Sequence, residues 1–156
     1  MDFDIISFTG VGLLRFGMTP DEAHAIVGTP GDMCILDYPN STKKERRETY
    51  SSGMHIMFTE PASSARLVEF VFWDQCRRLR YGGMDLFQVM PRVNVVRRLA
   101  ADDPDVKETF SILVFLRLGI TLTGFHDGEE SNLSVTVFEP GRWDEYVPSM
   151  KPFLVP

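Results

Sequence analysis

The sequence predicts an α+β fold in which two short helices pack on an antiparallel sheet. Three observations predict it: a helix with both ends marked near residues 19–28, apolar stretches with the alternation of strands, and a 66-residue spacing that recurs between two halves. We expect a single domain over residues 1–156, with similar helix-plus-meander halves at about 10–75 and 80–140 and a C-terminal tail at 141–156.

The first helix is the best-marked element of the chain. Thr19 is a favourable N-cap, Pro20 suits the first helical position, and Glu22 completes a capping box. Apolar residues at helical spacing follow, and Gly28 with Pro30 ends the helix after about two turns.

Strands account for most of the remaining first half. Alternating or dense apolar residues predict a lead-in strand within 1–10 and further strands at 13–16, 33–38, 48–58 and 67–73. The charge run Lys43–Arg47 is interpreted as a solvated turn or strand end, with a basic site as the alternative.

The second half follows the same plan. Gly82-Gly83 breaks the chain, and a second helix is expected from about Pro91 to Ala101. Strands are expected at 110–117, 119–125 and 133–138, with a hairpin turn at 126–130 that contains an Asp-Gly signal.

A weak internal repeat relates the two halves. Gly17-Met18 and Gly83-Met84 each precede an expected helix, while Gly53 within residues 50–58 corresponds to Gly119 within residues 116–124. Both pairs are 66 residues apart. The repeat predicts a helix followed by an antiparallel meander, twice, and the meanders can join into one sheet with both helices on one face.

Composition and charge limit the possible partners. No apolar run reaches the roughly 18 residues of a membrane span, and the acidic N-terminus is unlike a signal peptide, so we expect a cytoplasmic protein without membrane contact. The net charge of −6 arises entirely after residue 100, where 10 acidic residues face 4 basic ones. This imbalance disfavours nucleic-acid binding and fits a cationic partner, although a solvated surface is the simpler alternative.

Sequence motifs for catalysis are missing. The three histidines and two cysteines form no HxH, HExxH or CxxC pattern, and no GxGxxG, P-loop or GxSxG motif occurs. We therefore expect no catalytic residue, no metal site and no cofactor, and a protein that is not an enzyme.

Acidic loops and exposed aromatic residues are the better candidates for a binding surface. One acidic loop follows the second helix and another forms a hairpin tip, so they would create a single patch if both lay at the same end of the sheet. Trp143 and Tyr146 could anchor a partner or simply cover the core. The candidate partner-binding residues are Asp102, Asp103, Asp105, Asp127, Glu129, Glu130, Trp143 and Tyr146.

The helix-start pattern also carries a resemblance to known proteins. Gly12-x-x-x-x-Gly-Met-Thr-Pro-Asp-Glu22 with Val27-Gly-Thr-Pro30 resembles a pattern in small cytoplasmic bacterial proteins, many of them encoded beside polymorphic, Rhs or type VI-delivered toxins as immunity proteins. Tyr81–Phe87 and Leu118–Leu122 resemble the second half of that pattern, so the resemblance spans about residues 10–140. A related pattern occurs in outer-membrane assembly lipoproteins of the BamE type, which have a lipoprotein signal and a single unit.

The resemblance implies an immunity protein that neutralises a cognate secreted toxin by occluding its active site. A toxin that acts on nucleic acids is often basic, and an acidic inhibitor would suit it. Two alternatives stay open: an adaptor or chaperone for a secreted effector, and a small enzyme that uses His55 or His126 with a distant acid.

Overall fold

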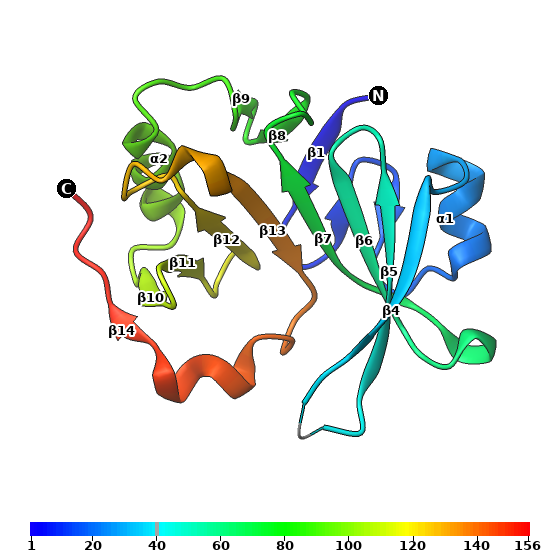
Figure 1. The fold of residues 1–156 in the computed structure, drawn as a ribbon. Coiled ribbons are helices and arrows are strands. Elements are labelled where there is room, and N and C mark those ends of the chain that lie inside the picture. Colours follow the sequence, from blue (N-terminus) through cyan, green and yellow to red (C-terminus); the bar gives the residue numbers. More distant parts are fainter. Residues whose placement is uncertain (40) are drawn as a thin grey trace.

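The computed structural model describes residues 1–39 and 41–156 and has an α+β fold, as the sequence predicts (Figure 1). These residues contain two α-helices, α1 at Pro20–Val27 and α2 at Val93–Asp102. Short 3-10 helices occupy Ala62–Ser64, Glu130–Asn132 and Asp144–Ser149. Figure 1 shows α1 and α2 on opposite sides of the molecule, with the strands between them.

Within the described residues, nine strands form a large antiparallel sheet. They are β4 (Asp32–Asp37), β5 (Lys44–Tyr50), β6 (Met54–Thr59), β7 (Leu67–Trp73), β10 (Lys107–Thr109), β11 (Ile112–Phe115), β12 (Ile120–Thr123), β13 (Ser134–Phe138) and β14 (Lys151–Pro152). Their order across the sheet is β14-β10-β11-β12-β13-β7-β6-β5-β4. The sheet therefore has β14 at one edge and β4 at the other.

A second sheet of five short strands lies beside the first. Its members are β1 (Phe3–Ile6), β2 (Gly10–Val11), β3 (Leu14–Arg15), β8 (Leu79–Tyr81) and β9 (Met84–Asp85), in the order β3-β2-β1-β8-β9. β1 and β8 run parallel, and the other neighbours run antiparallel.

The large sheet joins the two predicted halves. The meander β4–β7 follows α1, the meander β10–β13 follows α2, and the two meet where β7 pairs with β13. Gly53 lies directly before β6 and Gly119 directly before β12, so the 66-residue spacing marks equivalent strands. The strand order on one side of the β7–β13 pair thus mirrors the order on the other.

One face of the large sheet holds the hydrophobic core. Phe70 of β7 lies opposite Ile56 on one side and Val137 on the other, and directly opposite residues point to the same face. These side chains belong to one buried cluster that also contains Ala23 of α1 and Leu99 of α2. Both helices therefore pack on the same face, as the repeat predicted.

The first helix has the predicted ends. The Thr19 side chain accepts a hydrogen bond from the backbone N–H of Glu22, and the Glu22 carboxylate accepts one from the Thr19 N–H. Gly28 is the C-cap residue, with a φ of 84° that favours glycine.

Three details of the sequence prediction are wrong. Residues 48–58 form a hairpin of β5 and β6 around the turn at Gly53, and the strand pair β10 and β14 was not foreseen. Gly83-Met84 lies in the β8–β9 hairpin, well before α2, so it does not start a helix. Its structural counterpart is the β2–β3 hairpin, because both turn through a glycine at a φ near 57°, Gly12 at 59° and Gly82 at 55°.

Candidate binding cleft

Two buried carboxylates lie on the face of the large sheet that is turned away from both helices. Glu69 of β7 lies opposite Met57 of β6, which in turn lies opposite Arg47 of β5. Glu45 is two residues from Arg47 and therefore shares its face. Glu45 is only 1% exposed and Glu69 is 9% exposed, so both need compensating partners.

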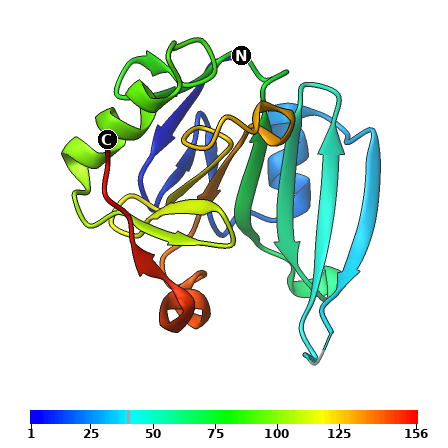
Figure 2. The ribbon, with the colours of Figure 1, turned by 60° about the vertical axis from the view of Figure 1, so that its left-hand side comes forward.

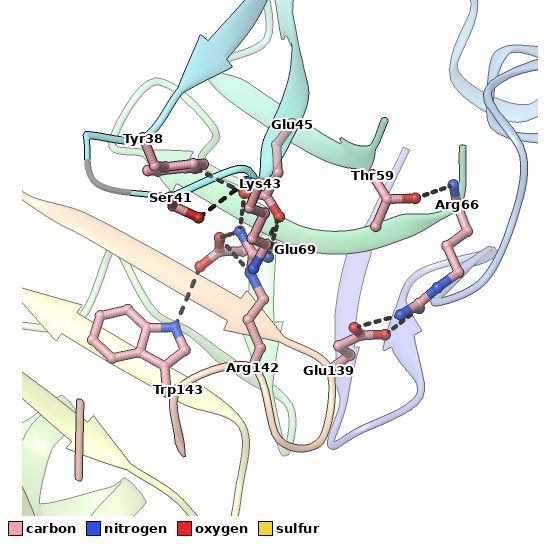
Figure 3. Close-up of polar contacts among 10 residues, drawn as sticks. All are labelled: Tyr38, Ser41, Lys43, Glu45, Thr59, Arg66, Glu69, Glu139, Arg142 and Trp143. Atoms are coloured by element: carbon pink, nitrogen blue, oxygen red, sulfur yellow. Dashed lines mark hydrogen bonds and ion pairs between the residues drawn. The ribbon is translucent and has the colours of Figure 1, made fainter. Parts of the chain in front are cut away.

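Arg142 supplies that compensation from the C-terminal segment (Figure 3). Its Nη1 and Nη2 donate to the two carboxylate oxygens of Glu45 at 2.5 and 2.8 Å. Its Nε and Nη2 donate to Oε2 of Glu69 at 2.8 and 2.6 Å. One guanidinium thus bridges two strands and fixes the chain after β13 against the sheet.

Three further side chains complete this network. The Tyr38 hydroxyl donates to Glu45 at 2.7 Å, and the Lys43 Nζ lies 3.6 Å from the same carboxylate. The Trp143 indole N–H donates to Glu69 at 3.4 Å. We call Tyr38, Lys43, Glu45, Glu69, Arg142 and Trp143 the Arg142 network.

The two carboxyl groups differ in proton affinity. Burial raises the pKa of Glu69 and outweighs the opposing effect of the Arg142 charge. Burial also acts to raise the pKa of Glu45, but hydrogen bonds from Arg142 and Tyr38 outweigh it and lower that pKa below its usual value. Burial and the hydrogen bond to Glu45 raise the pKa of Tyr38, so this phenol remains a donor at neutral pH.

The network forms part of the wall of a cleft of about 1020 Å³. The cleft lies between the chain after β4, the β10–β11 hairpin and the segment that follows β13. Four aromatic residues line it: Tyr38, Phe110, Trp143 and Tyr146. Carboxyl groups outnumber cations in the lining, with Glu45, Glu69, Glu139 and Glu145 against Lys43 and Arg142.

Phe110 stands at the rim of this cleft and is 79% exposed. It forms the β10–β11 turn with Ser111, between the paired residues Thr109 and Ile112. Both turn residues have positive φ, 50° for Phe110 and 63° for Ser111, as a type I′ hairpin turn requires. Such turns favour Asn or Gly at the first position. An exposed phenylalanine at this position therefore does not stabilise the fold, and its exposed ring suggests contact with another molecule.

The predicted acidic patch does not exist as one surface. Asp103 is fully buried, and its carboxylate accepts hydrogen bonds from the backbone N–H groups of Asp105 and Arg117 at 3.1 and 3.0 Å. The expectation that Asp103 contacts a partner is wrong, because this carboxylate ties the end of α2 to the turn between β11 and β12.

The remaining acidic residues lie at the two ends of α2. Asp102 ends the helix, accepts hydrogen bonds from Tyr81 and Arg98 and is exposed, and Asp105 is exposed beside Lys107. Glu130 instead pairs with Arg92, which precedes the helix, at 3.2 Å. A helix of ten residues spans about 15 Å, so the two loops do not meet.

The other four predicted residues also lie in different places, and only two of them line the cleft. Asp127 and Glu129 are exposed on the hairpin that follows β12, away from the cleft lining. Trp143 is half-buried, packs on Phe138 and bonds Glu69, which makes it a cover of the sheet. The Tyr146 ring packs against Trp143 at a tilt of 55°, with ring centroids 5.3 Å apart. Tyr146 is 40% exposed and lines the cleft.

The histidines lie outside the cleft lining. His24 contacts Glu48 at 2.8 Å, His126 contacts Glu108 at 3.0 Å, and His55 packs against Trp73. Over residues 1–39 and 41–156, no three His, Cys, Asp or Glu side chains are grouped so as to hold a metal ion.

Sequence reasoning missed Glu45 and Phe110. Glu45 lies in the charge run Lys43–Arg47, where β5 begins at Lys44, as the strand-end interpretation predicts. Lys43 and Lys44 are exposed, but Glu45 is only 1% exposed, so the expected solvation is wrong for this residue. The run of polar residues from 43 to 49 has no alternation of apolar and polar residues, so no local signal marked Glu45 as a buried strand residue. Phe110 gave no separate signal, because it stood at the start of an expected strand.

Comparison with known proteins identifies no relative: no family model matches the chain, and neither a curated protein nor a solved structure is similar to it. In the part of the chain that the structure describes, neither helix has the length and apolar character needed to cross a membrane.

Proposed function

We propose that this chain is an immunity protein that binds a cognate secreted antibacterial toxin in the cleft and thereby occludes the toxin's active site. The sequence resemblance motivates the class of protein. The observation that carries the binding site is Phe110, an aromatic ring 79% exposed at the rim of a 1020 Å³ cleft. Together with Tyr38, Trp143 and Tyr146 it gives the cleft four aromatic residues, and aromatic residues are enriched at protein interfaces.

The charge of the cleft supports a basic contact segment on the toxin. Three of the four lining carboxyl groups already have a cationic partner, since Glu45 and Glu69 share Arg142 and Glu139 pairs with Arg66 at 2.6 Å. The negative field at the edge of the cleft therefore comes mainly from the exposed carboxylate of Glu145. A basic loop would gain from this field during approach and would place its alkyl stems on Tyr38 and Tyr146. The cleft therefore replaces the α2 loops as the proposed contact surface.

The Arg142 network gives the cleft a fixed wall. Each carboxylate oxygen of Glu45 already accepts from Arg142, and Glu69 accepts from Arg142 and Trp143. A surface held in this way loses little conformational freedom on binding, which favours affinity.

Co-expression with the product of a neighbouring toxin gene tests the proposal. The chain should rescue growth and co-purify with the toxin, and Phe110→Asn should reduce both effects while leaving the fold intact, because Asn suits a type I′ turn. Leu13→Asn is the matched control, since Leu13 is 67% exposed on the β2–β3 turn, away from the cleft lining.

The outcomes separate the alternatives. A complex that leaves toxicity intact would contradict inhibition and favour the adaptor or chaperone alternative. Absence of both a complex and growth rescue would refute the proposed function.

A further inference from the structure

The two edges of the large sheet differ in how they are protected from other strands. β14 is a two-residue strand, Lys151–Pro152, and therefore combines short length, a lysine and a proline. These are the features by which natural sheets discourage edge-to-edge pairing. β4, at the opposite edge, has none of them.

β4 is a long and regular strand. All six of its residues, Asp32 to Asp37, pair in an unbroken register with β5. It contains neither lysine nor proline, and Figure 2 shows it at the outer margin of the sheet with no other segment along its free side. The free side of such a strand leaves backbone N–H and C=O groups available for a further strand.

The side chains of β4 are apolar where they are exposed at its centre. Met33 is 45% exposed and Ile35 is 46% exposed, and both lie on the face of the sheet that carries the helices. Cys34, between them, points to the opposite face and is partly exposed. An incoming strand would cover these three side chains.

We propose that β4 pairs antiparallel with β4 of a second copy of this chain, with Cys34 at the centre of the pair. A two-fold axis perpendicular to the sheet keeps each face on its own side, so residues on one face must oppose residues on the same face. Centring on Cys34 places Met33 against the partner's Ile35 and Ile35 against the partner's Met33. The two exposed apolar residues of each copy are then buried together.

The two neighbouring symmetric registers are less favourable. Centring on Met33 sets Ile35 against the partner's Gly31, which lies outside β4 and has no side chain to pack. Centring on Ile35 sets Met33 against the partner's Asp37, an apolar side chain beside a carboxylate. The register centred on Cys34 also keeps like charges apart, since Asp32 opposes the partner's Leu36. Complementarity within one short segment therefore favours a second copy over an unrelated strand.

Cys34 makes the register measurable. Directly opposed residues of an antiparallel pair have Cα atoms about 4.5 or 5.5 Å apart, a separation that a disulfide can bridge. The chain has two cysteines, and Cys76 is only 4% exposed. Diamide accepts the two hydrogens of a pair of thiols as they join in one disulfide, so a covalent dimer that depends on Cys34 would report this register.

The test combines mass and crosslinking on the full chain. Sedimentation should give twice the monomer mass, and Ile35→Lys should halve it, because a lysine at this position guards the edge. Leu13→Lys, at an exposed apolar residue far from β4 in the topology, should leave the dimer unchanged. Circular dichroism should be the same for all three proteins.

Diamide should trap the wild-type dimer and not the Cys34→Ser variant. A monomer at all concentrations, or a dimer that persists in Ile35→Lys, would overturn the pairing. A dimer without a Cys34 crosslink would overturn the register and with it the proposal. These outcomes do not depend on any toxin, so they are independent of the proposed function.

Discussion

Arg142 donates to Glu45 at 2.5 Å, although 97 residues separate the two in the chain. The same guanidinium donates to Glu69, 73 residues away. These contacts attach the segment after β13 to β5 and β7, and that segment forms one side of the cleft. Long-range ionic contacts thus shape the proposed binding surface.

Arg142→Ala should strongly destabilise the protein. It removes the cation from two buried carboxylates, and breaking a buried ion pair by removing one partner costs about 3–5 kcal/mol. Urea unfolding measures this cost. Lys44→Ala is the control, since Lys44 and Asp37 form an exposed pair at 3.7 Å that should contribute less than about 1 kcal/mol. Equal stability of the two variants would show that Arg142 is not a structural anchor.

Glu45 should make stability fall in acid. Its pKa is lowered in the folded state, so its ionised form contributes stability above its unfolded pKa of about 4.3. That contribution is lost as the pH falls through the lower folded value. The difference in the free energy of unfolding between wild type and Glu45→Gln should therefore be largest at pH 7 and become smaller towards pH 3. A difference that is constant with pH would exclude this linkage.

Glu69 should act with the opposite sign. Burial raises its pKa in the folded state, so the folded protein holds this proton more tightly than the unfolded chain. Its contribution should become more favourable as the pH falls from the raised folded value to the ordinary unfolded one. Wild type should gain stability relative to Glu69→Gln over that window in chemical unfolding experiments, and a loss would contradict the stated cause.

Asp103→Ala should destabilise the protein without a direct effect on a partner. The variant leaves the backbone N–H groups of Asp105 and Arg117 without their acceptor, at a cost of about 1–3 kcal/mol. Asp127→Ala, on an exposed loop, should change the free energy of unfolding by less than about 0.5 kcal/mol. Thermal or urea unfolding of both variants distinguishes the buried acid from the exposed one.

Thr19→Ala tests the capping box at the start of α1. The variant removes the acceptor for the Glu22 N–H, and loss of such a cap costs about 1 kcal/mol. Thr42→Ala, at an exposed position before β5, is the matched control. A fall in stability no larger than that of the control would mean that the capping box contributes little.

Local signals made much of the fold predictable. The residues that cap α1 are adjacent to it in the sequence, so both of its ends could be predicted locally. Strands such as β7 and β13 have dense or alternating apolar residues, which predict a strand without knowledge of distant contacts. The 66-residue spacing of Gly53 and Gly119 marked equivalent strands, because each glycine adopts a positive φ directly before one of them. The prediction that Gly83-Met84 starts a helix was wrong, because glycine occurs in hairpin turns as well as before helices, and here it lies in the β8–β9 hairpin.

The cleft could not be predicted because its parts come from distant segments. Glu45 is buried because Arg142, distant in the sequence, neutralises its charge. Asp103 is buried because the β11–β12 turn covers it and donates a backbone hydrogen bond to its carboxylate. Tyr146 was identified as a possible anchor from residue type alone, and it lines the cleft at 40% exposure. Its role in binding a partner stays a prediction.

Binding of the proposed cognate toxin by the Phe110→Asn variant is the most direct test of the proposed site. We propose Phe110 as a hot-spot residue of the interface, and truncation of such a residue costs about 2 kcal/mol or more, so we expect the dissociation constant to rise by about 30-fold or more. The Leu13→Asn control should bind as wild type does. If Phe110→Asn binds the toxin with the same affinity as wild type, the toxin does not occupy this cleft.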